Sequence, residues 1–312
     1  MSKGAVGDPA FVYHGLEGGA TAGAAPTDQL LLLASADGTL SAWNPVTRRC
    51  LHRRSMGGRV VSVGQLEDGR LWAHRRSVGV VLLSPDLGQE LGAELLPSAH
   101  VGFAAACSAG SQLVLPSAQT SGNTDLAQIR LYNCSGKSAV LAWSREASAD
   151  LGSLTALAFG GENLLVLAGF EDGSLRAYSH LDGSQLWGLK PFSDLVSALG
   201  LGLGLGVAGS SGNGLRFFSL PQGELEEVEI RLASPGLGAA AFRSDGKLLA
   251  LGGWDGGVRL LGVGKRKLLA AFRFHSASIH SLFFAGEKRA DSSWPLYVCS
   301  ADGRVSEWHL YP

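Results

Sequence analysis

Residues 32–43 read LLASADGTLSAW, and residues 298–308 repeat the pattern as VCSADGRVSEW. In both segments an apolar strand runs into an Asp-Gly turn, and the strand that follows ends on a tryptophan. Asp-Gly dipeptides accept the positive φ that tight hairpins between twisted strands require. One such hairpin is too small to bury its own apolar face, so repeated copies must pack against one another.

The pattern recurs seven times along the chain. Copies two and three match by spacing alone, because copy two has Ser77-Val78-Gly79 at its turn and copy three has a polar insertion over residues 116–128. A spacing of 40 to 49 residues is the length of a four-stranded propeller blade with variable loops. The sequence therefore predicts an all-β fold, a seven-bladed β-propeller, as a single domain over residues 1–312. The residues that close the copies are Trp43, Leu83, Tyr132, Tyr178, Phe218, Leu261 and Trp308.

Apolar segments of strand length flank these hairpins. Small residues on the inner strands fit the crowded centre, where the blades converge. Residues 15–29 contain no convincing inner strand for blade one. No outer strand follows Trp308, so we expect Phe11, Val12, Tyr13 and His14 to pair with the last blade and close the ring, which removes a free edge. Inner strands are expected at 60–63, 101–104, 154–159, 195–199, 238–242 and 279–284, and outer strands at 139–143 and 269–274.

The composition favours a turn-rich protein with a large core. Charged residues make up 17% of the chain, 44 of the 312 residues are glycine, and the formal net charge is −1. This balance gives no overall field that would steer nucleic acid or a membrane surface. The start of the chain has no apolar stretch of signal-peptide length. The four cysteines lie far apart in strand-like segments, unlike a disulfide framework. We therefore expect a protein of the nucleus and cytoplasm that is not secreted.

The sequence lacks the motifs for catalysis and cofactor binding, or has them without the structural context that they require. Residues 204–209 read GLGVAG, but a turn and a strand follow where a dinucleotide-binding helix would have to begin. The Gly-x-Ser-x-Gly elbow of hydrolases does not occur. His275 and His280 are five residues apart in strand-like sequence, which puts them on opposite faces and makes them poor joint metal ligands. We expect no catalytic residue, no cofactor and no metal site.

The last copy contains the residues of an internal hydrogen-bond network. In repeats of this kind a histidine before the inner strand, a serine, the turn aspartate and the strand tryptophan often bond to one another. His275, Ser300, Asp302 and Trp308 supply this set in blade seven. The other copies lack the full set, so their stability is expected to rest on apolar burial.

Four residues at the turns of copies four and six are candidates for binding a partner: Phe170, Glu171, Trp254 and Asp255. Large aromatic side chains at turns cost solubility unless they pack or bind something. For Trp254 the alternative is that its ring packs against a neighbouring blade. These four residues form the predicted partner-binding rim.

Basic clusters lie at residues 48–54, 75–76 and 265–267. Aromatic residues do not interleave with them, as binding of single-stranded nucleic acid would need. Solvated loops are the favoured interpretation, and no direct contact with nucleic acid is expected.

The second half of the chain resembles one subfamily of WD-repeat proteins. Its members are called G-protein β-subunit-like protein 1 in animals and ASTRA-associated protein 1 in fungi. The specific part of the resemblance covers roughly residues 165–312. Its segments are LAGFEDGS at 167–174, GGWD at 252–255, FHSA at 274–277 and WHLYP at 308–312.

The resemblance implies a non-enzymatic adaptor. Fungal members belong to the ASTRA assembly, which is linked to chromatin remodelling. Animal members are tied to the co-chaperone system that matures the phosphatidylinositol-3-kinase-related kinases. The implied partners are therefore co-chaperone or ASTRA subunits, bound by a monomeric propeller within a complex that does not contact nucleic acid or membrane directly.

Two other functions remain open. One is a generic WD-repeat adaptor, such as a ubiquitin-ligase substrate receptor or a G-protein-β-like signalling subunit. The other is an enzyme whose site lies in the central channel, which would need polar groups converging from several inner strands.

Overall fold

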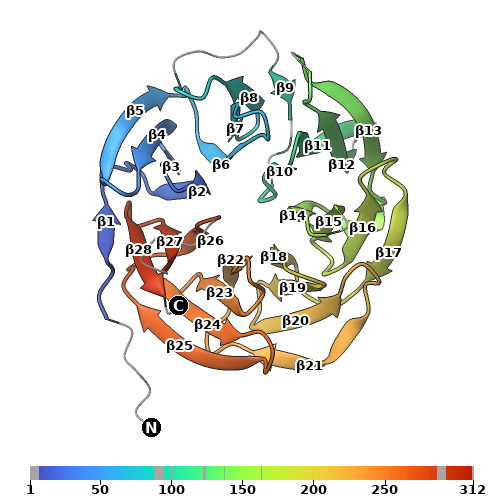
Figure 1. Ribbon diagram of the computed structural model, residues 1–312. Helices are drawn as coiled ribbons and strands as arrows, with labels where there is room; N and C mark the ends of the chain where they lie inside the picture. Colours follow the sequence, from blue (N-terminus) through green and yellow to red (C-terminus); the bar gives the residue numbers. More distant parts are fainter. Residues whose placement is uncertain are drawn as a thin grey trace.

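The strands form seven antiparallel sheets that stand around a central axis (Figure 1). The computed structural model describes residues 7–87, 95–98, 100, 102–121, 124–136, 138–162, 164–286 and 293–310. Each sheet has four strands, and within these residues the helical structure is limited to one 3-10 turn, η1 (Ala149–Leu151). The predicted all-β, seven-bladed propeller is confirmed, and the single-domain organisation stays a prediction.

Blades one to six each take four consecutive strands from the chain, from the inner to the outer edge. The first three blades are β2 (Ala20–Thr27), β3 (Leu30–Ser35), β4 (Thr39–Asn44) and β5 (Arg49–Ser55); β6 (Val60–Gln65), β7 (Leu71–Arg75), β8 (Gly79–Leu83) and β9 (Leu96–Pro97); and β10 (Cys107–Ala109), β11 (Gln112–Ser121), β12 (Thr124–Asn133) and β13 (Val140–Glu146).

The next three blades keep the same order. They are β14 (Leu154–Gly160), β15 (Leu165–Phe170), β16 (Leu175–Ser179) and β17 (Gln185–Leu189); β18 (Val196–Leu201), β19 (Leu205–Ser210), β20 (Gly214–Ser219) and β21 (Leu225–Arg231); and β22 (Leu237–Phe242), β23 (Leu248–Gly253), β24 (Gly257–Gly262) and β25 (Lys267–Arg273).

Blade seven joins the two ends of the described chain. It contains β26 (Ile279–Phe284), β27 (Trp294–Ser300), β28 (Val305–Leu310) and, as its outer strand, β1 (Phe11–Tyr13). β1 pairs antiparallel with β28, and Phe11 lies opposite Glu307. This confirms the predicted closure of the ring, with the strand ending at Tyr13.

The expectation that blade one lacks an inner strand is wrong. β2 fills this place with alanine, glycine and threonine, and it pairs with β3. The physical reason is the lack of space at the centre of the ring. A Cβ atom on Gly23 would lie 2.7 Å from the ring of Phe283 in blade seven. Small residues therefore mark this strand, although they give it no apolar signal in the sequence.

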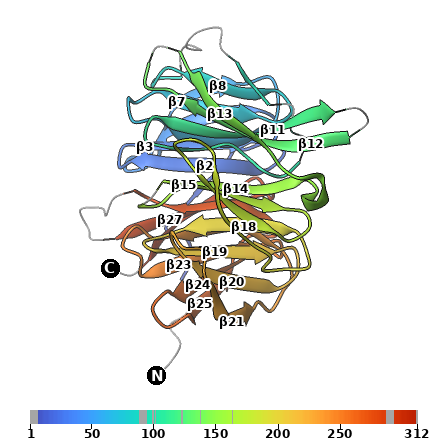
Figure 2. The ribbon, with the colours of Figure 1, turned by 90° about the vertical axis from the view of Figure 1, so that its right-hand side faces the viewer.

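Blade three departs from expectation in two places. Its inner strand is β10 and not residues 101–104, of which residue 101 lies outside the described residues. The polar insertion extends the middle hairpin, because β11 and β12 stay paired from Gln112 opposite Asn133 to Ser121 opposite Thr124. Figure 2 shows this hairpin projecting from one side of the disc.

The turns between the second and third strands of all blades lie on one face of the ring, because every blade runs its strands in the same direction. We call this the turn face; it carries the turns at residues 36–38, 254–256 and 301–303 and the β11–β12 hairpin. The core lies between neighbouring blades. Leu40 of blade one packs with Val60 and Leu71 of blade two, for example, and all three are fully buried.

Candidate interaction surface

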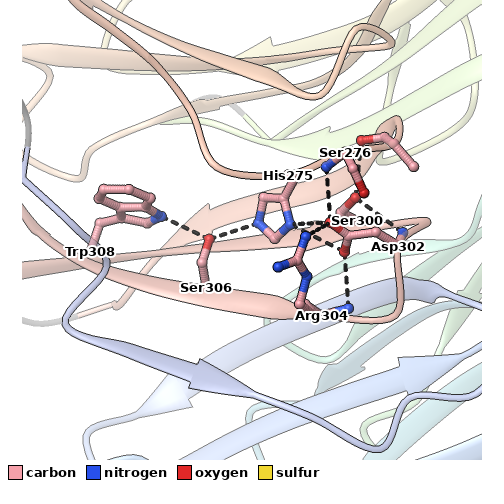
Figure 3. A network of polar contacts seen from close by, with 8 residues as sticks. His275, Ser276, Ser300, Asp302, Arg304, Ser306 and Trp308 are labelled. Atoms are coloured by element: carbon pink, nitrogen blue, oxygen red, sulfur yellow. Dashed lines mark hydrogen bonds and ion pairs between the residues drawn. The ribbon is translucent and has the colours of Figure 1, made fainter.

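A chain of hydrogen bonds crosses blade seven beneath the turn face (Figure 3). Trp308 Nε1 donates to Ser306 Oγ at 2.8 Å, and Ser306 Oγ lies 2.8 Å from His275 Nε2. His275 Nδ1 lies 3.0 Å from the nearer carboxylate oxygen of Asp302. A neutral ring with its proton on Nδ1 satisfies both contacts, since Ser306 can then donate to Nε2 and Asp302 can accept from Nδ1.

The serine that bridges the histidine and the tryptophan is Ser306, which was not among the four predicted network residues. Ser300 instead donates to the Ala277 carbonyl at 3.0 Å and accepts the backbone N–H of Asp302. The same Ser-x-Trp contact occurs in blade one, where Trp43 Nε1 donates to Ser41 Oγ at 2.9 Å. This repeated Ser-x-Trp signal is visible in the sequence and would have identified the bridging residue.

The charges of this network are compensated inside blade seven. Burial on its own would raise the pKa of Asp302, but hydrogen bonds from Arg304, Ser276 and His275 bring that pKa down to about 2. Burial lowers the pKa of His275, against the opposing effect of the Asp302 charge. At neutral pH the network therefore holds an ionised aspartate and a neutral histidine, which suits a structural role.

Phe170 does not belong to the rim. Its side chain is fully buried and packs in the core between blades three and four with Val114 and Leu151. The reason is its position as the last residue of β15, paired opposite Leu154 of the inner strand, before the turn begins. The prediction that it faces a partner is wrong.

The two acidic rim residues have different surroundings. Glu171 is exposed, and its carboxylate accepts the backbone N–H of Ser153 at 3.0 Å. Asp255 is clamped by Arg259 at 2.8 Å and by Arg273 at 3.1 Å. The hydrogen bond from Arg259 holds the pKa of Asp255 far below its usual range. Asp255 thus fixes the turn that carries Trp254.

Trp254 is 45% exposed on the turn face. Its ring rests on Gly236 of the same blade, where a Cβ atom would lie 2.2 Å from the ring and where φ is +82°. Ser278 of blade seven donates to the Trp254 carbonyl at 2.9 Å, and Trp254 N donates to the Gly236 carbonyl at 2.9 Å. One side of the indole is thus supported, and the other faces solvent from a fixed backbone.

Trp254 also borders the mouth of the central channel, which forms a cavity of about 370 Å³ on the turn face. Arg59, Arg76 and His280 supply its charged and titratable groups. Phe103 stands at its edge and is 76% exposed. The remaining wall is made by the starts of inner strands, at Thr21, Val61, Gly102, Thr155, Leu195, Ser197, Gly238, Ser278 and Ile279.

Sequence reasoning missed most of this mouth. Phe103 was assigned to an inner strand, where its side chain would have been expected to face the core. Arg59 and Arg76 lie just before and after the first hairpin of blade two, one of the two copies that match the repeat by spacing alone. The usable signal was the position of Arg59 directly before the predicted inner strand at 60–63.

Most arginines of the basic clusters contact groups within the chain. Arg48 lies over the Phe11 ring and 3.5 Å from Glu307, and Arg266 forms an ion pair with Glu226. Arg54 and Arg75 donate to the backbone carbonyls of Leu87 and Met56. Through these contacts the arginines of the basic clusters take part in the packing of the ring.

In the part of the chain that the structure describes, no three histidine, cysteine, aspartate or glutamate side chains gather in a way that could hold a metal ion. The four cysteines are free thiols. Nor does any helix in those residues have the length and apolar character to cross a membrane.

Comparison with known proteins finds two differently named relatives. A mouse protein, guanine nucleotide-binding protein subunit beta-like protein 1, is 31% identical over 152 residues, which are 47% of this chain and 45% of that protein. ASTRA-associated protein 1 of Schizosaccharomyces pombe is 39% identical over 70 residues, or 22% of this chain and 18% of that protein. The matched regions thus span less than half of either relative.

A solved structure shows the same fold. The crystal structure of the computationally designed Ika8 protein superposes with a TM-score of 0.72 and covers 97% of this chain and 100% of its own, at 19% identity. No protein-family model matches the chain. The ring of seven four-stranded sheets and the two partial sequence relatives together support the resemblance to WD-repeat proteins, with guanine nucleotide-binding protein subunit beta-like protein 1 and ASTRA-associated protein 1 among the proteins that the chain is similar to.

Proposed function

We propose that this protein is a non-enzymatic scaffold of the nucleus and cytoplasm that binds protein partners on its turn face. Its partners would be subunits of the ASTRA assembly, linked to chromatin remodelling, and of the co-chaperone system that matures the phosphatidylinositol-3-kinase-related kinases. The name of the fission-yeast relative and the subfamily segments at 167–174 and 252–255 support this assignment.

The observation that carries the proposal is the exposed indole of Trp254. Its turn is fixed by the ion pairs of Asp255 and by backbone hydrogen bonds, so binding would cost little conformational entropy. Tryptophan is among the residues that contribute most to protein interfaces when it becomes fully desolvated. A half-exposed, rigidly held tryptophan at a channel mouth that also carries a second exposed aromatic residue, Phe103, is therefore a suitable anchor.

Trp254→Ala is expected to release the partners and leave the fold intact. Truncating an interface tryptophan of this kind weakens binding by about 2 to 4 kcal/mol. The measurement is affinity purification of the tagged full chain from cells followed by quantitative mass spectrometry, with circular dichroism to check the fold.

Leu181→Ala is the matched control, because Leu181 is 77% exposed on the opposite face, between the third and fourth strands of blade four. It should keep all partners. A set of partners that Trp254→Ala leaves unchanged would contradict the proposal, and recovery of a ubiquitin-ligase core in place of co-chaperone or ASTRA subunits would favour the generic adaptor.

A further inference from the structure

The channel mouth has an apolar part and a basic part. Trp254 and Phe103 provide large exposed aromatic surfaces, and Arg59 and Arg76 provide guanidinium groups. None of the described residues that line the cavity is acidic. Charges of one sign at the mouth of a concave site concentrate ligands of the opposite sign.

The guanidinium group of Arg59 is the charged group at the channel mouth that is most clearly free to bind a ligand. Its side chain is exposed, and no hydrogen bond or ion pair to it occurs among the described residues. By contrast, the exposed arginine at the neighbouring rim, Arg273, is bound to Asp255. A guanidinium group presents paired N–H donors whose geometry matches the two oxygens of a carboxylate.

His280 adds a hydrogen-bond acceptor to the same cavity. Its Nδ1 lies 3.2 Å from the Ala20 carbonyl oxygen, which can only accept, so Nδ1 carries the proton. Partial burial lowers the pKa of His280 against the opposing effect of its hydrogen bond to the Ala20 carbonyl, and the nearby charge of Arg59 lowers that pKa further. The neutral ring therefore leaves Nε2 as an acceptor, and a backbone N–H of a bound chain is a fitting donor.

The positions of the two aromatic residues indicate an elongated occupant. Phe103 precedes the inner strand of blade three and Trp254 belongs to blade six, and these blades lie across the ring from each other (Figure 1). A ligand that touches both must cross the channel mouth. The cavity volume of about 370 Å³ has room for a few side chains and not for a folded domain.

We infer that the channel mouth binds an extended segment of a protein partner in which an aspartate or glutamate lies next to an aromatic or aliphatic residue. The carboxylate pairs with Arg59, apolar groups of the segment pack against Trp254 on one side of the mouth and against Phe103 on the other, and a backbone N–H of the segment donates to His280. This inference rests on the proposed scaffold function and names the chemistry of the partner segment.

A phage-displayed library of random peptides, selected on the purified full chain, tests this directly. We expect the selected pool to be enriched in acidic residues beside aromatic or aliphatic ones. The best peptide is then synthesised with a fluorophore, and its affinity is measured by fluorescence anisotropy. Replacing its acidic residue by the corresponding amide should weaken binding about tenfold, and adding salt should weaken the acidic form more than the amide form.

Arg59→Glu should weaken the acidic peptide by about tenfold or more, since attraction is replaced by repulsion. Because Arg59 is exposed, we expect the variant to melt like the wild type, which a thermal scan checks. Lys265→Glu is the matched charge reversal on the opposite face, where it lies in the turn between β24 and β25, and it should bind the peptide as the wild type does.

Several outcomes would overturn the inference. These are a pool without acidic enrichment, equal losses in Arg59→Glu and Lys265→Glu, and a phosphoserine peptide that binds far more tightly than its glutamate counterpart. Loss of cellular partners in Trp254→Ala without any acidic peptide binding would refute this inference and leave the scaffold function standing. Peptide binding that depends on Arg59, with cellular partners unchanged in Trp254→Ala, would support the site and refute the proposed function.

Discussion

Tyr13→Ala is expected to lower the free energy of unfolding by about 3 to 5 kcal/mol, the usual cost of truncating a buried aromatic side chain. Tyr13 is 1% exposed although it comes from a three-residue strand close to the start of the described chain. Its ring lies 4.8 Å from Phe11 and 5.2 Å from Trp43, measured between ring centroids. The residue therefore packs blade seven against blade one at the point where the ring closes.

The hydroxyl group of Tyr13 adds a polar part to this closure. It donates to Glu307 Oε2 at 2.8 Å, and the Glu307 carboxylate is fully buried. His309 Nε2 lies 2.8 Å from the other oxygen of Glu307. Tyr13→Phe keeps the ring and removes only the hydroxyl, so it should cost about 1.5 to 3 kcal/mol, the range for a hydrogen bond to a charged group.

Urea unfolding followed by tryptophan fluorescence measures both changes. Leu181→Ala serves as the reference for an exposed apolar side chain and should stay within about 0.5 kcal/mol of the wild type. The urea concentration at the unfolding midpoint should be highest for Leu181→Ala, lower for Tyr13→Phe and lowest for Tyr13→Ala. A Tyr13→Ala protein as stable as Leu181→Ala would show that β1 does not close the ring.

Acid is expected to destabilise the protein well above the range in which carboxylates titrate. His74 and His100 are 1% and 6% exposed, and burial lowers the pKa of each from 6.5 to about 4. The charge of His100 lowers the pKa of His74 further, and Arg76 acts likewise on His100. Both rings are therefore held neutral in the folded protein.

The direction in which stability changes with pH follows from proton binding. Between pH 6.5 and about 4 the unfolded chain takes up protons at these histidines and the folded chain does not, so stability falls as the pH falls. With about 1.4 kcal/mol for each pKa unit, the loss is on the order of 3 kcal/mol per histidine when the pH reaches the folded pKa. Asp302, whose folded pKa is about 2, adds a loss only below its ordinary value of 3.8.

His74→Asn is the variant that separates these contributions. His74 Nδ1 accepts the backbone N–H of Ala106 at 3.1 Å, and an asparagine side-chain oxygen can take over that role without titrating. The free energy of unfolding, measured by urea at several pH values, should fall less steeply in the variant, by up to about 1.4 kcal/mol per pH unit. Equal slopes in variant and wild type would contradict the assignment of the acid lability to His74.

The fold was predictable because its sequence pattern recurs in several copies along the chain. Asp-Gly turns and closing aromatic residues recur at blade length, and the pairing of Phe11–Tyr13 with β28 follows from the need to cover an edge. The inner strand of blade one was not predictable from apolarity. Its small residues are selected by the approach of Phe283, which belongs to blade seven and lies far away in the sequence.

The candidate site was predictable only in part, because exposure depends on register. Phe170 and Trp254 lie at similar places in their repeats, two residues and one residue before an Asp-Gly step. Phe170 is still in the strand and points into the core, whereas Trp254 is already in the turn. Phe103, Arg59 and Trp254 line the same cavity only when the ring is closed. No local sequence pattern predicts that they share this cavity.

Partner binding over the channel mouth on the turn face is the proposal on which the function depends. Amide hydrogen exchange, compared between the chain alone and the chain bound to its purified partner, tests it most directly. Slower exchange on binding is expected in the segments around Phe103, Trp254 and His280, with no change in the turns at residues 245–247 and 263–267 on the opposite face. Protection confined to those opposite turns, with exchange at the channel mouth unaltered, would contradict the claim.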